Sequence, residues 1–169
     1  MTLNWHALYV LTNSERKISE QLEILGFETC VPLQKQLRYW KDRKKLMDVV
    51  LFTNYVFIAS DPFRLSEPLQ VRNVFGYVKF GGKIANLTET EVSLIRTIGQ
   101  AGNPVKIQGG QVQVGDEVRV VRGPLQNLCG VVVSYGGGNQ LQLAIPSLQC
   151  FAQVTVSAGD IQRLREMGA

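Results

Sequence analysis

The sequence is poor in the residues on which metal binding and secretion depend. Its 169 residues include one histidine and three cysteines, and the cysteines form no CxxC pair. A zinc site needs about four such ligands, so this set is too small. The first five residues lack the basic segment and apolar run of a secretion signal. No stretch approaches the roughly 18 apolar residues of a membrane span. We therefore expect a cytoplasmic chain with reduced thiols, no cofactor, no metal and no membrane contact.

Groups that perform catalysis are also scarce. His6 lies in a predicted strand, and the pattern assigns it no cysteine or serine partner. The glycine triplet at 136–138 lacks the lysine and helix that would make it a phosphate-binding loop. We therefore expect a binding protein and not an enzyme.

The first 99 residues alternate strand and helix signals. Apolar residues make up 45% of the chain and charged residues 19%, which indicates folded domains. Helices are expected after Asn13 or Ser14, after Asp61, and after Thr88, where Glu91 completes a capping box. Strands are expected at 5–11, 27–31, 49–52, 55–58 and 74–80. This alternation predicts an α+β domain over residues 1–99.

The pattern changes after residue 99. Residues 100–110 carry little periodicity and three glycines, which predicts a linker. Residues 111–169 contain only short strands, expected at 116–121, 130–135, 140–144 and 152–156. Short strands at this spacing predict a small antiparallel barrel as a second domain.

The positive charge of the first domain is confined to one segment. Residues 1–99 hold 13 Lys and Arg against 10 Asp and Glu, a balance of +3. Residues 35–45 alone hold six basic residues against Asp42, a balance of +5, and they also present Tyr39 and Trp40. Basic and aromatic side chains together favour contact with a nucleic acid. The alternative is a solvated hairpin tip with Trp40 folded back on the domain. The residues concerned are Lys35, Arg38, Tyr39, Trp40, Lys41, Arg43, Lys44 and Lys45.

Several stretches, in both domains, resemble the NusG family of transcription factors. Residues 114–120, Gly123-Pro124 and 128–132 resemble its KOW motif, a strand, a turn and a strand that begins at a glycine, here Gly130. Residues 51–58, LFTNYVFI, resemble the "LFPNYLFV" segment of the family's N-terminal (NGN) domain, and residues 74–81 resemble its later strand. The basic stretch at 38–45 is similar to the specialised RfaH and UpxY-type paralogues. The resemblance implies an antiparallel NGN sheet with flanking helices, joined by a linker to a KOW domain of SH3-like barrel form.

The resemblance also implies partners. Family members bind the clamp helices of the largest RNA polymerase subunit through an aromatic patch, here Tyr9, Phe52, Tyr55 and Phe57. Strand alternation puts Tyr55 and Phe57 on one face of the sheet. That face either meets the polymerase or is covered by the domain's own helices. The nucleic acid would be DNA of the transcription bubble, touched by the basic segment and by Arg72.

The second domain departs from the family pattern. The loop by which housekeeping members meet Rho or a ribosomal protein is here Pro146-Ser147-Leu148-Gln149-Cys150, in which Leu148 could act as an apolar contact. We therefore do not expect Rho binding, and nascent RNA or a ribosomal protein stay open as partners. Three glycines at 136–138 would each cost about 1 kcal/mol inside a helix. We expect a constitutive barrel rather than one that refolds into helices.

The expected function is transcription elongation or antitermination at selected operons, by a monomer that bridges the DNA cleft of RNA polymerase and suppresses pausing. One alternative is a housekeeping NusG that acts on all genes. Another is an RNA- or ribosome-binding KOW protein that does not bind polymerase.

Overall fold

The computed structural model describes residues 2–102, 104–110, 115–135 and 138–164. The chain divides into two compact units, Met1–Arg96 and Thr97–Ala169. Within the described ranges, no helix has the length and hydrophobicity needed to cross a membrane.

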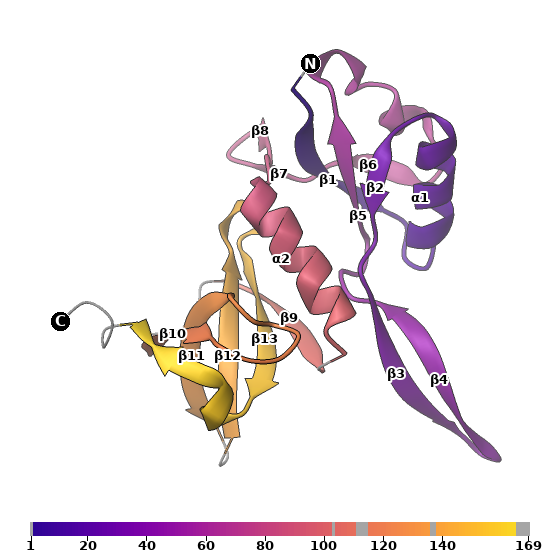
Figure 1. Ribbon diagram of the computed structural model, residues 1–169. Helices are drawn as coiled ribbons and strands as arrows, with labels where there is room; N and C mark the ends of the chain where they lie inside the picture. The colour runs from indigo at the N-terminus through magenta and orange to yellow at the C-terminus, as the bar shows by residue number, and fades with distance from the viewer. Residues whose placement is uncertain (1, 103, 111–114, 136–137, 165–169) are drawn as a thin grey trace. The chain divides into compact units, whose positions relative to one another are not determined.

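A four-stranded antiparallel sheet forms the centre of the first unit. Its strands are β1 (Asn4–Val10), β2 (Glu28–Cys30), β5 (Tyr55–Ser60) and β6 (Val74–Tyr77), in the order β2-β5-β1-β6 (Figure 1). Strands β1 and β5 lie inside this order and are apolar along most of their length, as expected for strands covered on both faces.

Two helices cover opposite faces of this sheet. Leu8 and Val10 of β1 join a buried cluster with Ile18 and Leu22 of α1 (Glu15–Ile24). Because side chains alternate along a strand, Trp5 of β1 faces the other way. There the guanidinium of Arg96, from α2 (Glu89–Gln100), lies 5.0 Å from the centre of the Trp5 ring.

The start of α2 has the expected capping box. The Thr88 backbone N–H donates to Glu91 Oε2 at 2.8 Å, and the Glu91 N–H donates to Thr88 Oγ1 at 3.2 Å. The helix expected after Asp61 is only a short 3-10 turn, η1 (Pro62–Arg64), in which Asp61 accepts from the Phe63 N–H at 2.8 Å. A second such turn, η2 (Pro68–Gln70), and the strand pair β7 (Lys79–Phe80) and β8 (Lys83–Ile84) complete the connections.

The basic segment forms a hairpin that is a sheet of its own. Strands β3 (Leu33–Trp40) and β4 (Arg43–Val50) pair antiparallel along their whole length and join at Lys41-Asp42. The hairpin projects beyond the four-stranded sheet (Figure 1). At its base the Leu51 N–H donates to the Pro32 carbonyl at 2.9 Å.

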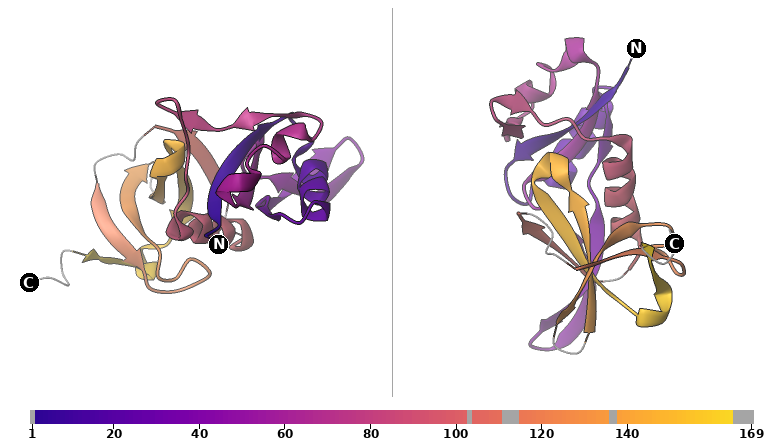
Figure 2. Two further views of the ribbon diagram at one scale, coloured as in Figure 1. Left: turned by 90° about the horizontal axis from the view of Figure 1, so that it is seen from above. Right: turned by 90° about the vertical axis from the view of Figure 1, so that its left-hand side faces the viewer.

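The second unit is a six-stranded antiparallel sheet in the order β14-β10-β11-β12-β13-β9. Figure 2 shows its strands strongly twisted. The bounds are β9 (Val105–Gly109), β10 (Asp116–Val120), β11 (Cys129–Tyr135), β12 (Gly138–Ile145), β13 (Cys150–Val156) and β14 (Ile161–Arg163), with 3-10 turns η3 (Pro146–Leu148) and η4 (Ala158–Asp160).

The predicted linker at 100–110 is wrong for residues 105–109. Val105 is buried and pairs with Val154, so this stretch forms the edge strand β9 of the six-stranded sheet. The short strand β14 was not predicted either. Gly138, the last residue of the expected turn at 136–138, begins β12. Residues 136–137 of that turn lie outside the described residues, as do residues 111–114.

Two glycines of the KOW-like motif allow close backbone approach. A Cβ at Gly130 would lie 2.5 Å from the Gln142 carbonyl oxygen, and one at Gly115 would lie 2.5 Å from that of Val132. Real Cβ atoms do not approach a backbone oxygen this closely, so only glycine lets these segments meet.

We expect Gly130→Ala to destabilise the chain by about 1–3 kcal/mol, because the neighbouring strand would have to shift. Gly109→Ala is the matched control, since a Cβ at Gly109 in edge strand β9 would meet no atom within 4 Å. Urea unfolding followed by circular dichroism measures both variants. Equal stability of the two would contradict the close-approach explanation.

Candidate functional site

Three aromatic rings meet at one end of the four-stranded sheet. Tyr9 of β1 pairs with Tyr55 of β5 and with Gly76 of β6, next to Phe75. The centre of the Tyr9 ring lies 6.1 Å from those of Tyr55 and Phe75. Tyr9 is 47% and Phe75 63% exposed, and Tyr55 is half-buried. We call Tyr9, Tyr55 and Phe75 the aromatic cluster.

The aromatic cluster borders a shallow hollow of about 360 Å³, which Gly76, Tyr77, Val78, Lys79 and Phe80 also line. The buried Tyr77 hydroxyl donates to the Leu65 carbonyl at 2.8 Å. Burial raises the pKa of Tyr77 to about 12, and Lys79 is the charged residue of the lining. The hollow therefore offers a mainly apolar, aromatic surface.

A turn centred on Asn54 fixes the position of Tyr55. Asn54 has the left-handed φ of 71°, which asparagine tolerates better than most residues. Its backbone N–H donates to the buried Glu15 carboxylate at 2.9 Å. Its side-chain amide donates to the Val10 carbonyl at 3.0 Å and to the Thr12 hydroxyl at 2.7 Å. These bonds hold the start of β5 against β1 and α1.

Two of the four rings expected on this surface are buried. Phe52 is 3% and Phe57 1% exposed, and they pack edge to face with centres 5.2 Å apart. Tyr55 and Phe57 do share a face of β5, as the alternation predicts. However, β5 is an interior strand whose residues 56–60 are all buried, so only Tyr55, at its first position, reaches the surface. The expectation of an exposed patch that includes Phe52 and Phe57 is wrong.

Phe75 takes the place of these rings, and the sequence prediction did not include it in the site. Strand alternation gives no signal for this, because it places Phe75 and Tyr77, two residues apart, on one face. In the structure Tyr77 is buried and Phe75 exposed, and the pairing of β1 with β6 shifts register between Tyr9 and Val10. The sequence alone does not show that β6 is an edge strand beside Tyr9.

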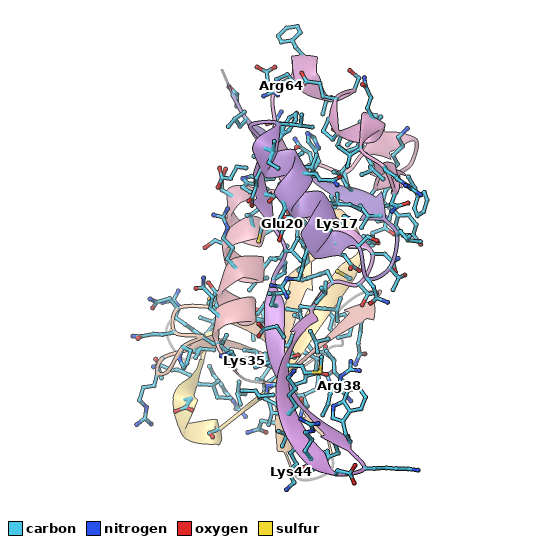
Figure 3. The ribbon with its side chains drawn as sticks, turned by 90° about the vertical axis from the view of Figure 1, so that its right-hand side faces the viewer. Lys17, Glu20, Lys35, Arg38, Lys44 and Arg64 are labelled. Atoms are coloured by element: carbon cyan, nitrogen blue, oxygen red, sulfur yellow. The ribbon has the colours of Figure 1, made fainter. Side chains whose placement is uncertain are left out.

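The hairpin separates its side chains onto two faces. Trp40 stands opposite Arg43, and Arg38 opposite Lys45, on one face. Tyr39 opposite Lys44 and Leu37 opposite Leu46 lie on the other, and Lys35 shares that face (Figure 3). Like charges directly opposite each other, as at Arg38 and Lys45, destabilise a strand pair. Such a face favours an anionic partner.

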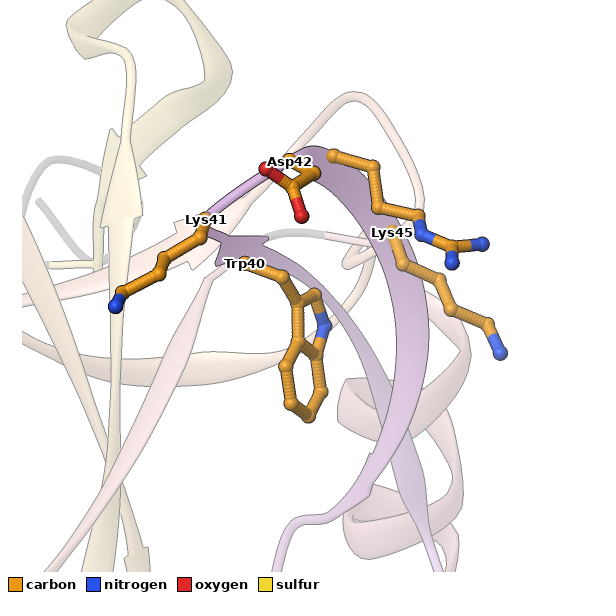
Figure 4. Close-up of a pocket in the computed structure, with 5 residues that line it drawn as sticks. Trp40, Lys41, Asp42 and Lys45 are labelled. Carbon is orange, nitrogen blue, oxygen red and sulfur yellow. The ribbon is translucent and has the colours of Figure 1, made fainter.

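Both aromatic rings of the hairpin are available to a partner. Tyr39 is 70% and Trp40 61% exposed, so Trp40 does not fold back onto the domain. The Lys44 ammonium lies 5.2 Å from the centre of the Tyr39 ring. The tip residues Trp40, Lys41, Asp42, Arg43 and Lys45 border a hollow of about 580 Å³ (Figure 4).

The remaining expected site residues lie elsewhere. Arg72 is exposed in the turn between η2 and β6, outside the hairpin. Leu148 is 5% exposed, which corrects the expectation that it forms an accessible contact. It ends η3, where Gln149 takes a left-handed φ of 51° and turns the chain from β12 into β13. This turn directs Leu148 into the interior of the second unit.

The histidine and the partly buried cysteine of the first unit have structural surroundings. His6 is buried, and its Nδ1 lies 3.0 Å from the Ala85 carbonyl oxygen, the geometry of a donated hydrogen bond. Burial raises the pKa of the Cys30 thiol, and a hydrogen bond with Arg96 acts in the opposite direction. Within the described part of the chain, no group of three or more His, Cys, Asp or Glu could hold a metal ion.

Comparison with known proteins gives consistent matches. The profile of the family described as "Transcription termination factor nusG" matches residues 3–96. The NusG termination/antitermination protein of Deinococcus radiodurans is 28% identical over 158 residues, covering 78% of this chain and 83% of that protein. The Thermus thermophilus NusG is 28% identical over 153 residues, covering 78% and 82%. A structure of Thermotoga maritima NusG, solved for its domain interaction, has a similar fold, with a TM-score of 0.59, 20% identity and coverage of 97% and 98%.

We expect Phe57→Ala to cost about 3–5 kcal/mol of unfolding free energy, because it empties a buried site. Phe75→Ala should change stability by less than about 1 kcal/mol, because the ring is largely exposed. Urea unfolding of both variants measures the difference. Similar costs would show that the burial of the two rings is not as described.

Proposed function

The chain belongs to the NusG family of transcription termination and antitermination factors, and we propose that it acts on elongating RNA polymerase at selected operons. The observation that carries this proposal is the exposed aromatic cluster of Tyr9, Tyr55 and Phe75 beside its hollow. Contiguous exposed apolar surface of this kind marks a partner site.

The proposed partner of the aromatic cluster is the pair of clamp helices on the largest polymerase subunit. Aromatic rings bury about 150–250 Å² each and dominate the energetics of interfaces. A shallow hollow lined by rings fits the apolar side of a helix. Phe52 and Phe57 are not part of the proposed contact, because they are buried and pack against each other.

The proposed partner of the hairpin is DNA of the transcription bubble. Residues 33–50 hold six basic residues against Asp42 and Asp48, a balance of +4, which equals the formal charge of the whole chain. Basic side chains release counterions when they meet phosphates, and exposed rings stack on unpaired bases. Arg72, on another part of the first unit, is proposed as a further DNA contact.

Attachment to both polymerase and DNA would bridge the cleft and disfavour pausing. The hairpin supports a specialised, operon-restricted role over a global one, because its exposed Tyr39 and Trp40 rings can reach bases, which carry the sequence information that phosphates lack. For the second unit we propose a KOW-type barrel that contacts nascent RNA or a ribosomal protein. The close-approach glycines Gly115 and Gly130 support that assignment, and Leu148 is not part of the proposed contact.

We expect the double variant Tyr9→Ala/Phe75→Ala to bind core RNA polymerase at least about tenfold more weakly, because truncating one interface hot spot costs about 2 kcal/mol. Biolayer interferometry with purified polymerase and no ribosomes measures this. Phe63→Ala is the matched control, since Phe63 is 92% exposed on the same unit but lies outside the aromatic cluster.

Unchanged binding by the folded double variant would contradict the aromatic cluster as the polymerase site. If the wild-type chain itself did not bind polymerase, the proposal would fail, and an RNA- or ribosome-binding role would be favoured instead.

We expect Arg38→Gln/Lys45→Gln to weaken binding of single-stranded DNA and to reduce the salt dependence. Each lost phosphate contact lowers the slope of log K against log salt by about 0.7, so two lower it by about 1.4. Titrations at several salt concentrations measure the slope. Arg16→Gln/Lys17→Gln removes the same charge from the exposed surface of α1 (Figure 3). An equal effect of this control pair would show that only net charge matters.

A further inference from the structure

The hollow at the hairpin tip contains one residue that phosphate binding does not explain. Asp42 is the only acidic residue among residues 35–45, and it is exposed beside three cations. A carboxylate at this place weakens attraction to a phosphate backbone. The Asp42 side chain therefore needs an explanation of its own.

The internal interactions of the tip do not account for Asp42. In the part of the chain that the structure describes, its carboxylate has no ion pair within 4.0 Å and accepts no hydrogen bond. It thus forms no ion pair with Lys41 or Arg43 and does not cap its own turn. By contrast, Asp61 does bond to a backbone N–H two residues on.

The neighbours of Asp42 supply the other parts of a base-binding site. Trp40 offers an exposed ring on which a base can stack. Figure 4 shows Asp42 at the bend of the hairpin, with Trp40 and Lys41 on one strand side and Lys45 on the other. Lys41, Arg43 and Lys45 can meet the phosphates on either side of a stacked nucleotide.

We propose that this hollow binds a single unpaired guanine nucleotide. The Trp40 ring stacks on the base, Asp42 accepts hydrogen bonds from guanine N1–H and N2–H, and the three cations meet the flanking phosphates. The proposal deepens the proposed function and rests on it, because it requires that the hairpin binds nucleic acid. It adds a base preference and a residue that sets it.

Guanine is favoured because of its donor pattern. An ionised carboxylate has two oxygens and only accepts hydrogen bonds. Guanine presents two adjacent donors on its Watson–Crick edge, whereas adenine and cytosine present a donor beside an acceptor and thymine one donor between two acceptors. That edge is occupied in a duplex, so the base must be unpaired.

The test uses the full chain and short oligothymidylates that carry one central guanine, adenine, cytosine or thymine. Anisotropy of a labelled oligonucleotide gives the affinity, and quenching of Trp40 fluorescence reports stacking, since the other tryptophan, Trp5, is buried. We expect the guanine oligonucleotide to bind at least about fivefold more tightly, the low end for a bidentate base contact.

The deciding variant is Asp42→Asn. We expect it to reduce the guanine preference to less than about twofold, because asparagine cannot accept two hydrogen bonds in parallel. Its affinity for plain oligothymidylate should rise, because a negative charge is lost. Asp48→Asn is the matched control. Asp48 is exposed and stands opposite Lys35, away from the tip, so this variant should gain affinity and keep the guanine preference.

Three outcomes would overturn the inference, and they separate it from the proposed function. If all oligonucleotides quench Trp40 and the wild type shows no preference for guanine, the hairpin binds DNA but has no base-specific site. If the guanine preference persists in Asp42→Asn, Asp42 is not the residue that recognises guanine. No binding of any oligonucleotide removes the nucleic-acid role itself, while polymerase binding by the aromatic cluster stands as a separate result. The same measurement is made with an oligouridylate that carries one central guanine. Tighter binding of the RNA or of the DNA oligonucleotide shows whether the guanine comes from nascent RNA or from bubble DNA.

Discussion

The exposed end of the four-stranded sheet depends on one turn, that of Asn54. Its backbone and side-chain hydrogen bonds join the end of β1, the start of β5 and the buried Glu15 of α1. The Val10 N–H returns a bond to the Asn54 carbonyl at 2.8 Å, so the two strands are held in one register. That register sets Tyr55 opposite Tyr9. A slip of β5 by one residue would move Tyr55 to the other face of the sheet, away from Tyr9. The proposed polymerase surface is thus determined by a polar network beneath it.

The hairpin follows a different principle. It pairs with no third strand among the described residues, and isolated two-stranded hairpins are only marginally stable in water. Cations opposite each other, such as Arg38 and Lys45, lower that stability further. This arrangement suits a binding element, since an anionic ligand removes the repulsion. The loss of stability is confined to the hairpin, and the four-stranded sheet does not depend on the hairpin for its own stability.

The sequence predicts local features of this chain well and exposure poorly. The Thr88 capping box is as expected, because every atom in it belongs to one turn of chain. The shared face of Tyr55 and Phe57 also follows from strand geometry. Which of the two rings is exposed depends on strand order and on helix placement, which involve distant residues. Phe75 was left out of the predicted site, and Leu148 was wrongly expected at the surface, for the same reason.

The two proposed sites therefore differ in how their binding energy would be used. The aromatic cluster is fixed by the core, so little conformational entropy is lost when a partner covers it. The hairpin tip must order long side chains such as Lys41 and Lys45, at a cost of about 0.5–1.5 kcal/mol each. Its phosphate contacts are also screened by salt. Polymerase binding through the cluster would hold the hairpin near DNA, where a high effective concentration offsets these costs. Base selection at the tip needs only weak intrinsic affinity under that condition, which is why a carboxylate among cations is tolerated there.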